Sequence, residues 1–276
     1  ELADAMHVQA NSLAYCSGYS GSSNLPAITL AERLSEICYP SINHFFFTSG
    51  GGEATDSSIK MARSHWKLQG QPTKTKVISR LDGYHGVTFA AMSATGLSQY
   101  WPLFEPRMPG FVHIPSPNPY RYQASAGVSQ GIAAANELER VIQLEGADTV
   151  AMFIAEPVQG AGGVIVPPDD YFPRIREICN QYDVLLVADE VITGFGRTGK
   201  LFALNHWNVE PDIVQFAKAI TSGYFPFGGI GISDALAETQ RASNQPWMHA
   251  YTYSAHPVGC ATALRTLQII KDENFS

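Results

Sequence analysis

The sequence lacks the features that mark membrane, secreted and nucleic-acid-binding proteins. Its four cysteines, Cys16, Cys38, Cys179 and Cys260, are scattered among 276 residues without a metal-site spacing, which predicts reduced thiols in a cytoplasmic protein without a metal. Apolar runs such as 150–155 are far too short to cross a membrane. The N-terminus has neither the basic region nor the apolar core of a signal peptide. No Lys/Arg-rich stretch occurs and the formal net charge is −7, so a nucleic-acid partner is not expected.

Short apolar runs instead alternate with helical patterns along the chain. The runs of strand length lie at 44–48, 76–80, 111–114, 149–157, 183–189, 212–217 and 228–233. Several have no polar alternation, as expected of strands covered on both faces. The helical patterns lie at 53–69, 130–145, 171–182 and from Pro257 onward, and Thr29 to Glu32 reads as a capping box that begins another helix. This order predicts an α/β protein, a three-layer α/β/α fold with a mostly parallel sheet of about seven strands.

A lysine and a carboxylate end two of these apolar runs. Lys218 follows DIVQFA and Asp189 ends DVLLVAD, and in such sheets ligands bind at the carboxyl ends of strands. Most lysines lie on the surface, but the apolar neighbours of Lys218 predict a partly desolvated, nucleophilic amine. An enzyme that uses pyridoxal 5′-phosphate (PLP) needs such a pair. The amine forms a Schiff base with the cofactor, and the acid keeps the pyridine nitrogen protonated.

Three further segments contain residues that suit such a cofactor. Glycines at 50–52 lie between a strand and a helix, where their N–H groups favour phosphate over a merely flexible turn. Tyr84 and His85 follow the run at 76–80, and an aromatic ring there either stacks on a planar cofactor or simply packs. Glu156 ends another strand, as a solvated rim group or as a buried orienting group.

The segment GFGRTG at 194–199 matches a dinucleotide-binding fingerprint, which leaves a nicotinamide-dependent oxidoreductase as an alternative. That fingerprint requires the first glycine directly at a strand-to-helix turn. Here DEVIT separates the strand from Gly194 and the following pattern is poorly helical, so a structural loop is the better interpretation.

Six segments, taken in order, resemble the class III PLP-dependent aminotransferases of fold type I. They are FFFTSGGGEA, GYHG, AEPVQGAGG, DEVITGFGRTG, DIVQFAKAITSGYFPFGG and YTYSAHPVGCA. The resemblance covers nearly the whole chain and points to the ω-amino acid and ω-amine:pyruvate transaminase branch.

The resemblance implies a role for each matching residue around the cofactor ring. Lys218 resembles the Schiff-base lysine and the catalytic residue of the family. Asp189 resembles the partner of the pyridine nitrogen, and Val191 the aliphatic contact on one ring face. Tyr84 resembles the aromatic residue stacked on the other face, with His85 beside it.

It also implies the residues that bind the phosphate. Gly51 and Gly52 match the Gly-Ser pair whose amides hold the phosphate, with Gly52 in place of the usual serine. Thr252 resembles the threonine that reaches the phosphate of the neighbouring subunit, which implies a homodimer with shared sites. Glu156 resembles the acid beside the cofactor. Ala161 stands where the ornithine and 4-aminobutyrate branch usually has glutamate, which favours the ω-amine:pyruvate branch.

The resemblance further implies that residues 1–276 are the PLP-binding large domain, with 1–43 as its N-terminal lead-in. The family's C-terminal small domain, which usually holds the arginine for a substrate carboxylate, and its N-terminal segment would lie outside this chain. The expected activity is ping-pong transfer of an amino group from an ω-amine or ω-amino acid to a keto acid, with pyruvate the expected acceptor. Two alternatives stay open: a related aminomutase or racemase, and a core fragment that binds PLP without turnover.

Overall fold

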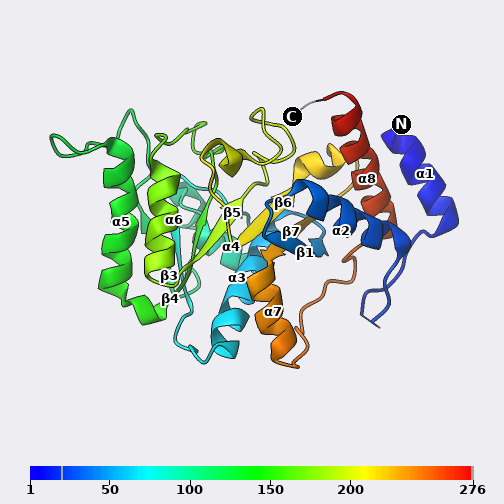
Figure 1. The fold of residues 1–276 in the computed structure, drawn as a ribbon, viewed down its shortest axis with the longest axis horizontal. Coiled ribbons are helices and arrows are strands. Elements are labelled where there is room, and N and C mark those ends of the chain that lie inside the picture. The colour runs from blue at the N-terminus through cyan, green and yellow to red at the C-terminus, as the bar shows by residue number, and fades with distance from the viewer. Residues whose placement is uncertain (20, 275–276) are drawn as a thin grey trace.

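The fold is built around one sheet of seven strands (Figure 1). The computed structural model describes residues 1–19 and 21–274. The strands are β1 (Ile42–Thr48), β2 (Lys76–Arg80), β3 (Phe111–Ile114), β4 (Val150–Ala155), β5 (Leu185–Asp189), β6 (Ile213–Ala217) and β7 (Gly228–Ser233). Their order is β1-β7-β6-β5-β4-β2-β3, and only β7 runs antiparallel to its neighbours. The predicted mostly parallel, seven-stranded sheet is therefore confirmed.

Helices cover both faces of the sheet and give it two hydrophobic cores. They are α1 (Leu2–Ser12), α2 (Leu25–Ile37), α3 (Gly51–Leu68), α4 (Phe89–Ala94), α5 (Gln130–Glu145), α6 (Tyr171–Gln181), α7 (Asp234–Ala242) and α8 (Pro257–Asp272). One core contains buried residues of α2, α5, α6 and α8, and the other contains those of α3 and α7. In Figure 1, α5 and α6 lie at one end of the molecule, and α1 lies beside α8 at the other. This is the predicted α/β/α arrangement.

The sequence predicted the β2, β3 and β7 ranges and the start of α8 at Pro257, but it missed two helices and one cap. The short α4 and α7 have too few turns to give a clear apolar stripe. The predicted capping box at Thr29 is wrong, because Thr29 lies inside α2. Asn24 begins this helix instead, and its side chain accepts a hydrogen bond from the Ala27 N–H at 3.0 Å.

The apolar strands bring the predicted site residues to one edge of the sheet. All residues of β4, β5 and β6 are buried, because helices pack on both faces. These three strands are parallel, so their carboxyl ends lie at the same edge. Glu156 directly follows β4, Asp189 is the last residue of β5, and Lys218 directly follows β6. None of the helices in the described ranges is both long and apolar enough to cross a membrane.

Candidate active site

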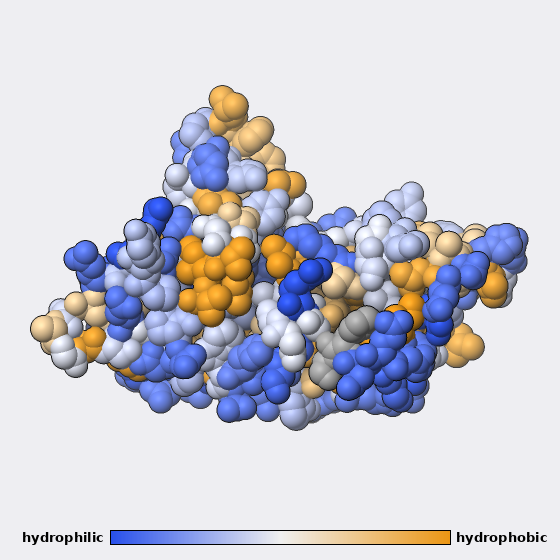
Figure 2. Space-filling view, turned by 90° about the horizontal axis from the view of Figure 1, so that it is seen from above, coloured by the Kyte–Doolittle hydropathy of each residue, from blue (hydrophilic) through white to orange (hydrophobic). Residues whose placement is uncertain are grey.

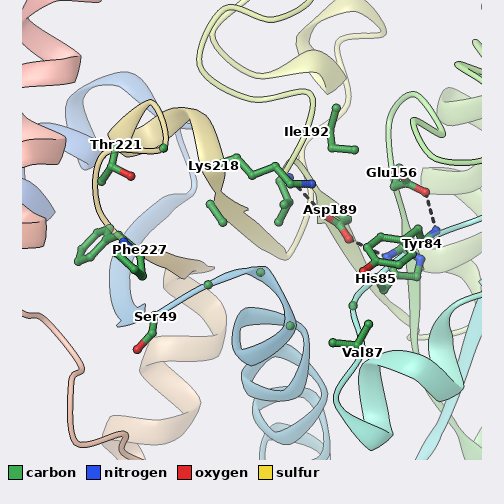
Figure 3. Close-up of a pocket in the computed structure, with 18 of the residues that line it drawn as sticks. Ser49, Tyr84, His85, Val87, Glu156, Asp189, Ile192, Lys218, Thr221 and Phe227 are labelled. Atoms are coloured by element: carbon green, nitrogen blue, oxygen red, sulfur yellow. Dashed lines mark hydrogen bonds and ion pairs between the residues drawn. The ribbon is translucent and has the colours of Figure 1, made fainter. Parts of the chain in front are cut away.

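A cavity of about 410 Å³ opens at this carboxyl edge. Its lining includes eight of the nine predicted site residues: Gly51, Gly52, Tyr84, His85, Glu156, Asp189, Val191 and Lys218. Figure 3 shows that Lys218 and Asp189 extend toward the same part of the cavity, with Tyr84 and His85 beside them. Segments that lie far apart in the sequence thus meet around one space.

The glycine loop forms one end of the cavity. Helix α3 begins at Gly51, and the N–H groups of its first turn have no partner within the helix. A Cβ atom added to Gly51 would lie 3.1 and 3.2 Å from the two methyl carbons of Val191, so this loop packs closely on the residue after β5. A Cβ atom at Gly52 would meet only ordinary contacts, the nearest at 3.6 Å from the Thr88 methyl. The loop therefore presents bare amides to the cavity at the positive end of an 18-residue helix.

Lys218 directly follows β6, and its backbone has a conformation that residues other than glycine seldom adopt. Its φ is +49°, in the left-handed region that functional sites often use. Its side chain is exposed, which corrects the expectation of a partly desolvated amine. The apolar neighbours Phe216 and Ile220 are buried in the core, while Lys218 lines the open cavity. Across the described ranges, the amine makes no hydrogen bond or ion pair, and Lys218 lines the cavity.

Asp189 is held by two hydrogen bonds at the end of β5. The His85 ring Nδ1 donates to Asp189 Oδ2 at 2.7 Å, and the Val191 N–H donates to Oδ1 at 3.1 Å. Asp189 and His85 are 3% and 4% exposed, so this pair is shielded from water. The carboxylate keeps further acceptor sites because each oxygen has two lone pairs. An N–H group of a bound ring can use one of them.

Glu156 holds two loops of the cavity wall. Its Oε1 accepts the Tyr84 N–H at 2.9 Å, and its Oε2 accepts the Gly160 N–H at 3.0 Å. Burial raises the pKa of this carboxyl; Asp189 adds to the effect, and His85, the Tyr84 N–H and Arg80 oppose it. Of the two interpretations left open by the sequence, the buried orienting group fits this geometry. What it orients directly is main chain, including that of Tyr84.

Thr252 does not line the cavity. It lies in an exposed turn, where its carbonyl accepts a hydrogen bond from the Tyr15 hydroxyl at 2.9 Å. Several residues that sequence reasoning missed do line it, among them Val87, Ile192 and Thr221. The first two directly follow the motifs GYHG and DEV, so proximity along the chain was the signal that could have found them.

The segment at 194–199 forms a structural loop. Gly196 and Gly199 have positive φ values of 91° and 86°, and no helix begins at this loop. Phe195 is buried and packs against the rings of Phe202 and Phe216. The strand–glycine–helix geometry of a dinucleotide site is therefore not formed here.

The mostly parallel α/β sheet thus places a lysine, a carboxylate and an amide-lined helix start around one cavity, an arrangement that suits a phosphate-bearing cofactor with a reactive carbonyl. The chain belongs to the class III aminotransferases, because the family model "Aminotransferase class-III" matches residues 1–276. This family is PLP-dependent.

Relatives and solved structures agree with this assignment. The chain is 42% identical to the putrescine–pyruvate aminotransferase of Pseudomonas aeruginosa, over 100% of this chain and 60% of that protein. It is 49% identical to the structure of a thermostable (S)-enantioselective ω-transaminase from Thermomicrobium roseum, with a TM-score of 0.94 over 99% of this chain and 61% of the other. The ω-transaminase of Pseudomonas jessenii in complex with PMP has a TM-score of 0.95 and 42% identity, over 99% and 61% of the two chains. The chain thus spans about 60% of the length of these proteins.

Proposed function

We propose that this protein is a PLP-dependent aminotransferase that moves an amino group from an ω-amine or ω-amino acid to a keto acid. The observation that carries the proposal is the meeting of Lys218, Asp189 and the Gly51 loop around one cavity. We further propose that residues 1–276 correspond to the cofactor-binding large domain, with 1–43 as its lead-in. Activity, substrates and partners belong to the whole protein.

The donors and acceptors of the cavity fit PLP. The bare amides of Gly51 and Gly52 would bind the phosphate, and Asp189 would accept a hydrogen bond from the pyridine nitrogen. Val191 and Tyr84 would contact the two faces of the ring. Lys218 would bind the cofactor covalently through its amine. The close packing of Gly51 on Val191 leaves little room for a side chain at position 51, which suits a main-chain phosphate site there.

PLP supplies an electron-accepting ring and a carbonyl carbon that condenses with amines. The remaining chemistry falls to side chains of this protein. The Lys218 Nζ takes a proton from the amine-bearing carbon of the donor as general base, and later returns one as general acid. Asp189 would keep the pyridine nitrogen of the cofactor protonated by accepting its N–H hydrogen bond, and His85 and the Val191 N–H hold the carboxylate in place for this role. The order is ping-pong, with the carbonyl product leaving before the keto acid enters.

Pyruvate is the acceptor that we propose. The putrescine–pyruvate aminotransferase relative is named for this acceptor, and Ala161 favours the same branch. The amine donor is of the ω-amine or ω-amino acid class. We propose that the reaction takes place in the cytoplasm, on the sequence argument from scattered cysteines.

We also propose that the enzyme works as a homodimer in which Thr252 reaches the phosphate of the neighbouring subunit. Thr252 lies outside the cavity of its own chain, in an exposed turn. Several large apolar side chains are exposed, including Val87 at 69% beside the cavity and Tyr253 at 60% next to Thr252. Hydrophobic atoms also gather in the middle of one face, between hydrophilic ones (Figure 2). A second copy of the chain would cover such surfaces.

Replacement of Lys218 by alanine tests the proposed function directly. In protein expressed from the complete gene, we expect Lys218→Ala to abolish the visible absorbance of the lysine-bound cofactor and amino-group transfer to pyruvate. Retained full activity would overturn the assignment. Isomerisation of a single substrate, without transfer to pyruvate, would favour an aminomutase or racemase instead.

A further inference from the structure

Three buried polar side chains form a cluster between α3 and β6, behind the cavity. Thr55, Ser58 and Gln215 are all 0% exposed. The Gln215 Nε2 donates to the Thr55 Oγ1 at 3.0 Å. The Ser58 hydroxyl lies within hydrogen-bond distance of both the Gln215 Oε1, at 3.1 Å, and the Ala54 carbonyl, at 3.0 Å. Since burying polar groups costs free energy unless they are paired, a cluster kept at this position calls for a role that apolar packing would not provide.

The Thr55 hydroxyl connects this cluster to the main chain of His85. It donates to the His85 carbonyl at 2.8 Å. The Gly51 carbonyl, one helical turn earlier, lies 3.2 Å from the same hydroxyl. A hydroxyl has only one proton, and the shorter contact receives it. Gln215 occupies an acceptor site of the hydroxyl, which leaves the proton free to point at His85.

His85 is in turn fixed on both sides of its peptide. Its N–H donates to the Thr95 Oγ1 at 2.9 Å, and its carbonyl accepts from Thr55. From this fixed main chain, the ring Nδ1 donates to Asp189 at 2.7 Å. The contacts thus run from Gln215 through Thr55 and His85 to Asp189. Gln215 and Asp189 are themselves paired neighbours on β6 and β5, so the series begins and ends on the same two strands.

We propose that Thr55 is a positioning residue for the cofactor site. Its hydroxyl, oriented by Gln215, fixes the His85 main chain and, through the His85 ring, the Asp189 carboxylate. The inference rests on the proposed function only in that Asp189 is taken to face the pyridine nitrogen. The same hydroxyl lies 3.2 Å from the Gly51 carbonyl, so Thr55 stands between the glycine loop and the His85 segment.

Two replacements at Thr55 separate this role from simple packing. Thr55→Val keeps the shape and removes the hydroxyl, whereas Thr55→Ser keeps the hydroxyl and removes the methyl group. The first readout is hydrogen–deuterium exchange of the segment 81–87 in the cofactor-free protein. The second is the Kd of PLP by absorbance titration. Both use protein expressed from the complete gene, and urea unfolding measures the stability of each variant.

We expect Thr55→Val to speed exchange in this segment and to raise the Kd of PLP, each by about tenfold, the order expected when a buried hydrogen bond is lost. Thr55→Ser should remain within about twofold of the wild type in both. Equal impairment of the two variants, or wild-type values for Thr55→Val, would overturn the proposal.

A double variant guards against a general loss of stability. Thr55→Val leaves the Gln215 amide without its partner, and adding Gln215→Met removes that unpaired group. We expect the double variant to regain stability while exchange at 81–87 and the Kd stay raised. If both return to wild-type values, the effect was strain and Thr55 does not position His85. Exchange is measured without cofactor or substrate, so its result is independent of the Lys218→Ala test of the reaction.

Discussion

Two lysines at different ends of the sheet show what separates a site residue from a structural one. Lys74 precedes β2 and is 2% exposed. Its ammonium donates to the carbonyls of Val150, Tyr182 and Asp183 at 3.3, 3.2 and 2.6 Å, and lies 4.5 Å from the ring centre of Trp66. Lys218, at the carboxyl end of β6, is exposed and faces the cavity.

Burial is therefore not what distinguishes the proposed catalytic lysine. Lys74 is the more buried of the two, and burial lowers its pKa, yet its three donors are all used by carbonyls. Lys218 has its donors free and its backbone held at a positive φ. The comparison teaches that unused hydrogen-bonding capacity directed into a cavity is the better mark of a functional site.

The largest expected effect comes from Lys218. Lys218→Ala should lower kcat for transamination by about 10³-fold or more, because it removes both the covalent attachment and the proton carrier. The unfolding free energy should change by less than about 0.5 kcal/mol, since the side chain is exposed. Steady-state kinetics and urea unfolding measure the two quantities. A large loss of stability would show that Lys218, like Lys74, is structural.

Lys74 should give the opposite result. Lys74→Met leaves three carbonyls without a donor and removes the cation–π contact with Trp66. We expect a loss of about 2 kcal/mol in the unfolding free energy, with kcat within about twofold of the wild type. The exposed Lys200 offers a matched control, and Lys200→Met should change neither quantity. Unchanged stability in Lys74→Met would break the comparison.

A pair of histidines extends the comparison. The His85 ring is paired with Asp189, whereas Nε2 of His113 in β3 is buried with no hydrogen-bond partner among residues 1–19 and 21–274. Burial, aided by Arg107, lowers the pKa of His113 from 6.5 to about 4. Between pH 6.5 and about 4, His113 is protonated in the unfolded chain and neutral in the folded one. The unfolding free energy therefore falls as the pH is lowered through this window.

The slope of unfolding free energy against pH measures this effect. His113→Phe keeps the ring contact with Trp101 and removes the titrating group. It should reduce the slope between pH 6.5 and 4 by up to about 1.4 kcal/mol per pH unit. Burial also lowers the pKa of His249 to about 4. This histidine is present in both proteins, so its contribution to the slope remains after the replacement. An unchanged slope would contradict the prediction.

The smallest effects are expected at the glycine loop. Gly52→Ser meets only ordinary contacts and adds a hydroxyl near the proposed phosphate site, so we expect the Kd of PLP to fall by up to about fivefold. Gly51→Ala would place its methyl group 3.1 Å from a methyl carbon of Val191. Because this contact is too close, we expect the Kd of PLP to rise by a similar factor of about five. Absorbance titration of the cofactor-free protein distinguishes the two. Equal effects would mean that this loop does not bind the phosphate through its amides.

Much of the fold could be predicted from the sequence because its strands are continuous apolar runs. The runs at 76–80, 111–114 and 228–233 became β2, β3 and β7 without a change of bounds. The cap of α2 could not be found in the same way. Both Asn24 and Thr29 suit an N-cap, and the choice depended on the Asn24 side chain, which also donates to the Ala255 carbonyl, 231 positions away.

The candidate site was predicted as a set of residues, and their connections were not. Local motifs identified Lys218, Asp189, Tyr84 and Glu156 one by one. The exposure of Lys218 was predicted wrongly, because neighbouring residues in a sequence point in opposite directions along a strand end. No sequence pattern indicated Thr55, because a threonine inside a helix is ordinary by itself. Its proposed positioning role depends on His85 and Gln215, which pack against α3 from other segments.

The sequence by itself determined the layers of the fold, the edge at which ligands bind, and the chemical types of the groups gathered there. Those properties follow from apolar periodicity and from which side chains end the strands. The tertiary structure alone decided which donors were used and which stayed free. Hydrogen bonds between residues separated by 30 to 160 positions, such as those of Thr55 with His85 and Gln215, depend on how α3 packs on the sheet. No local pattern encodes that packing.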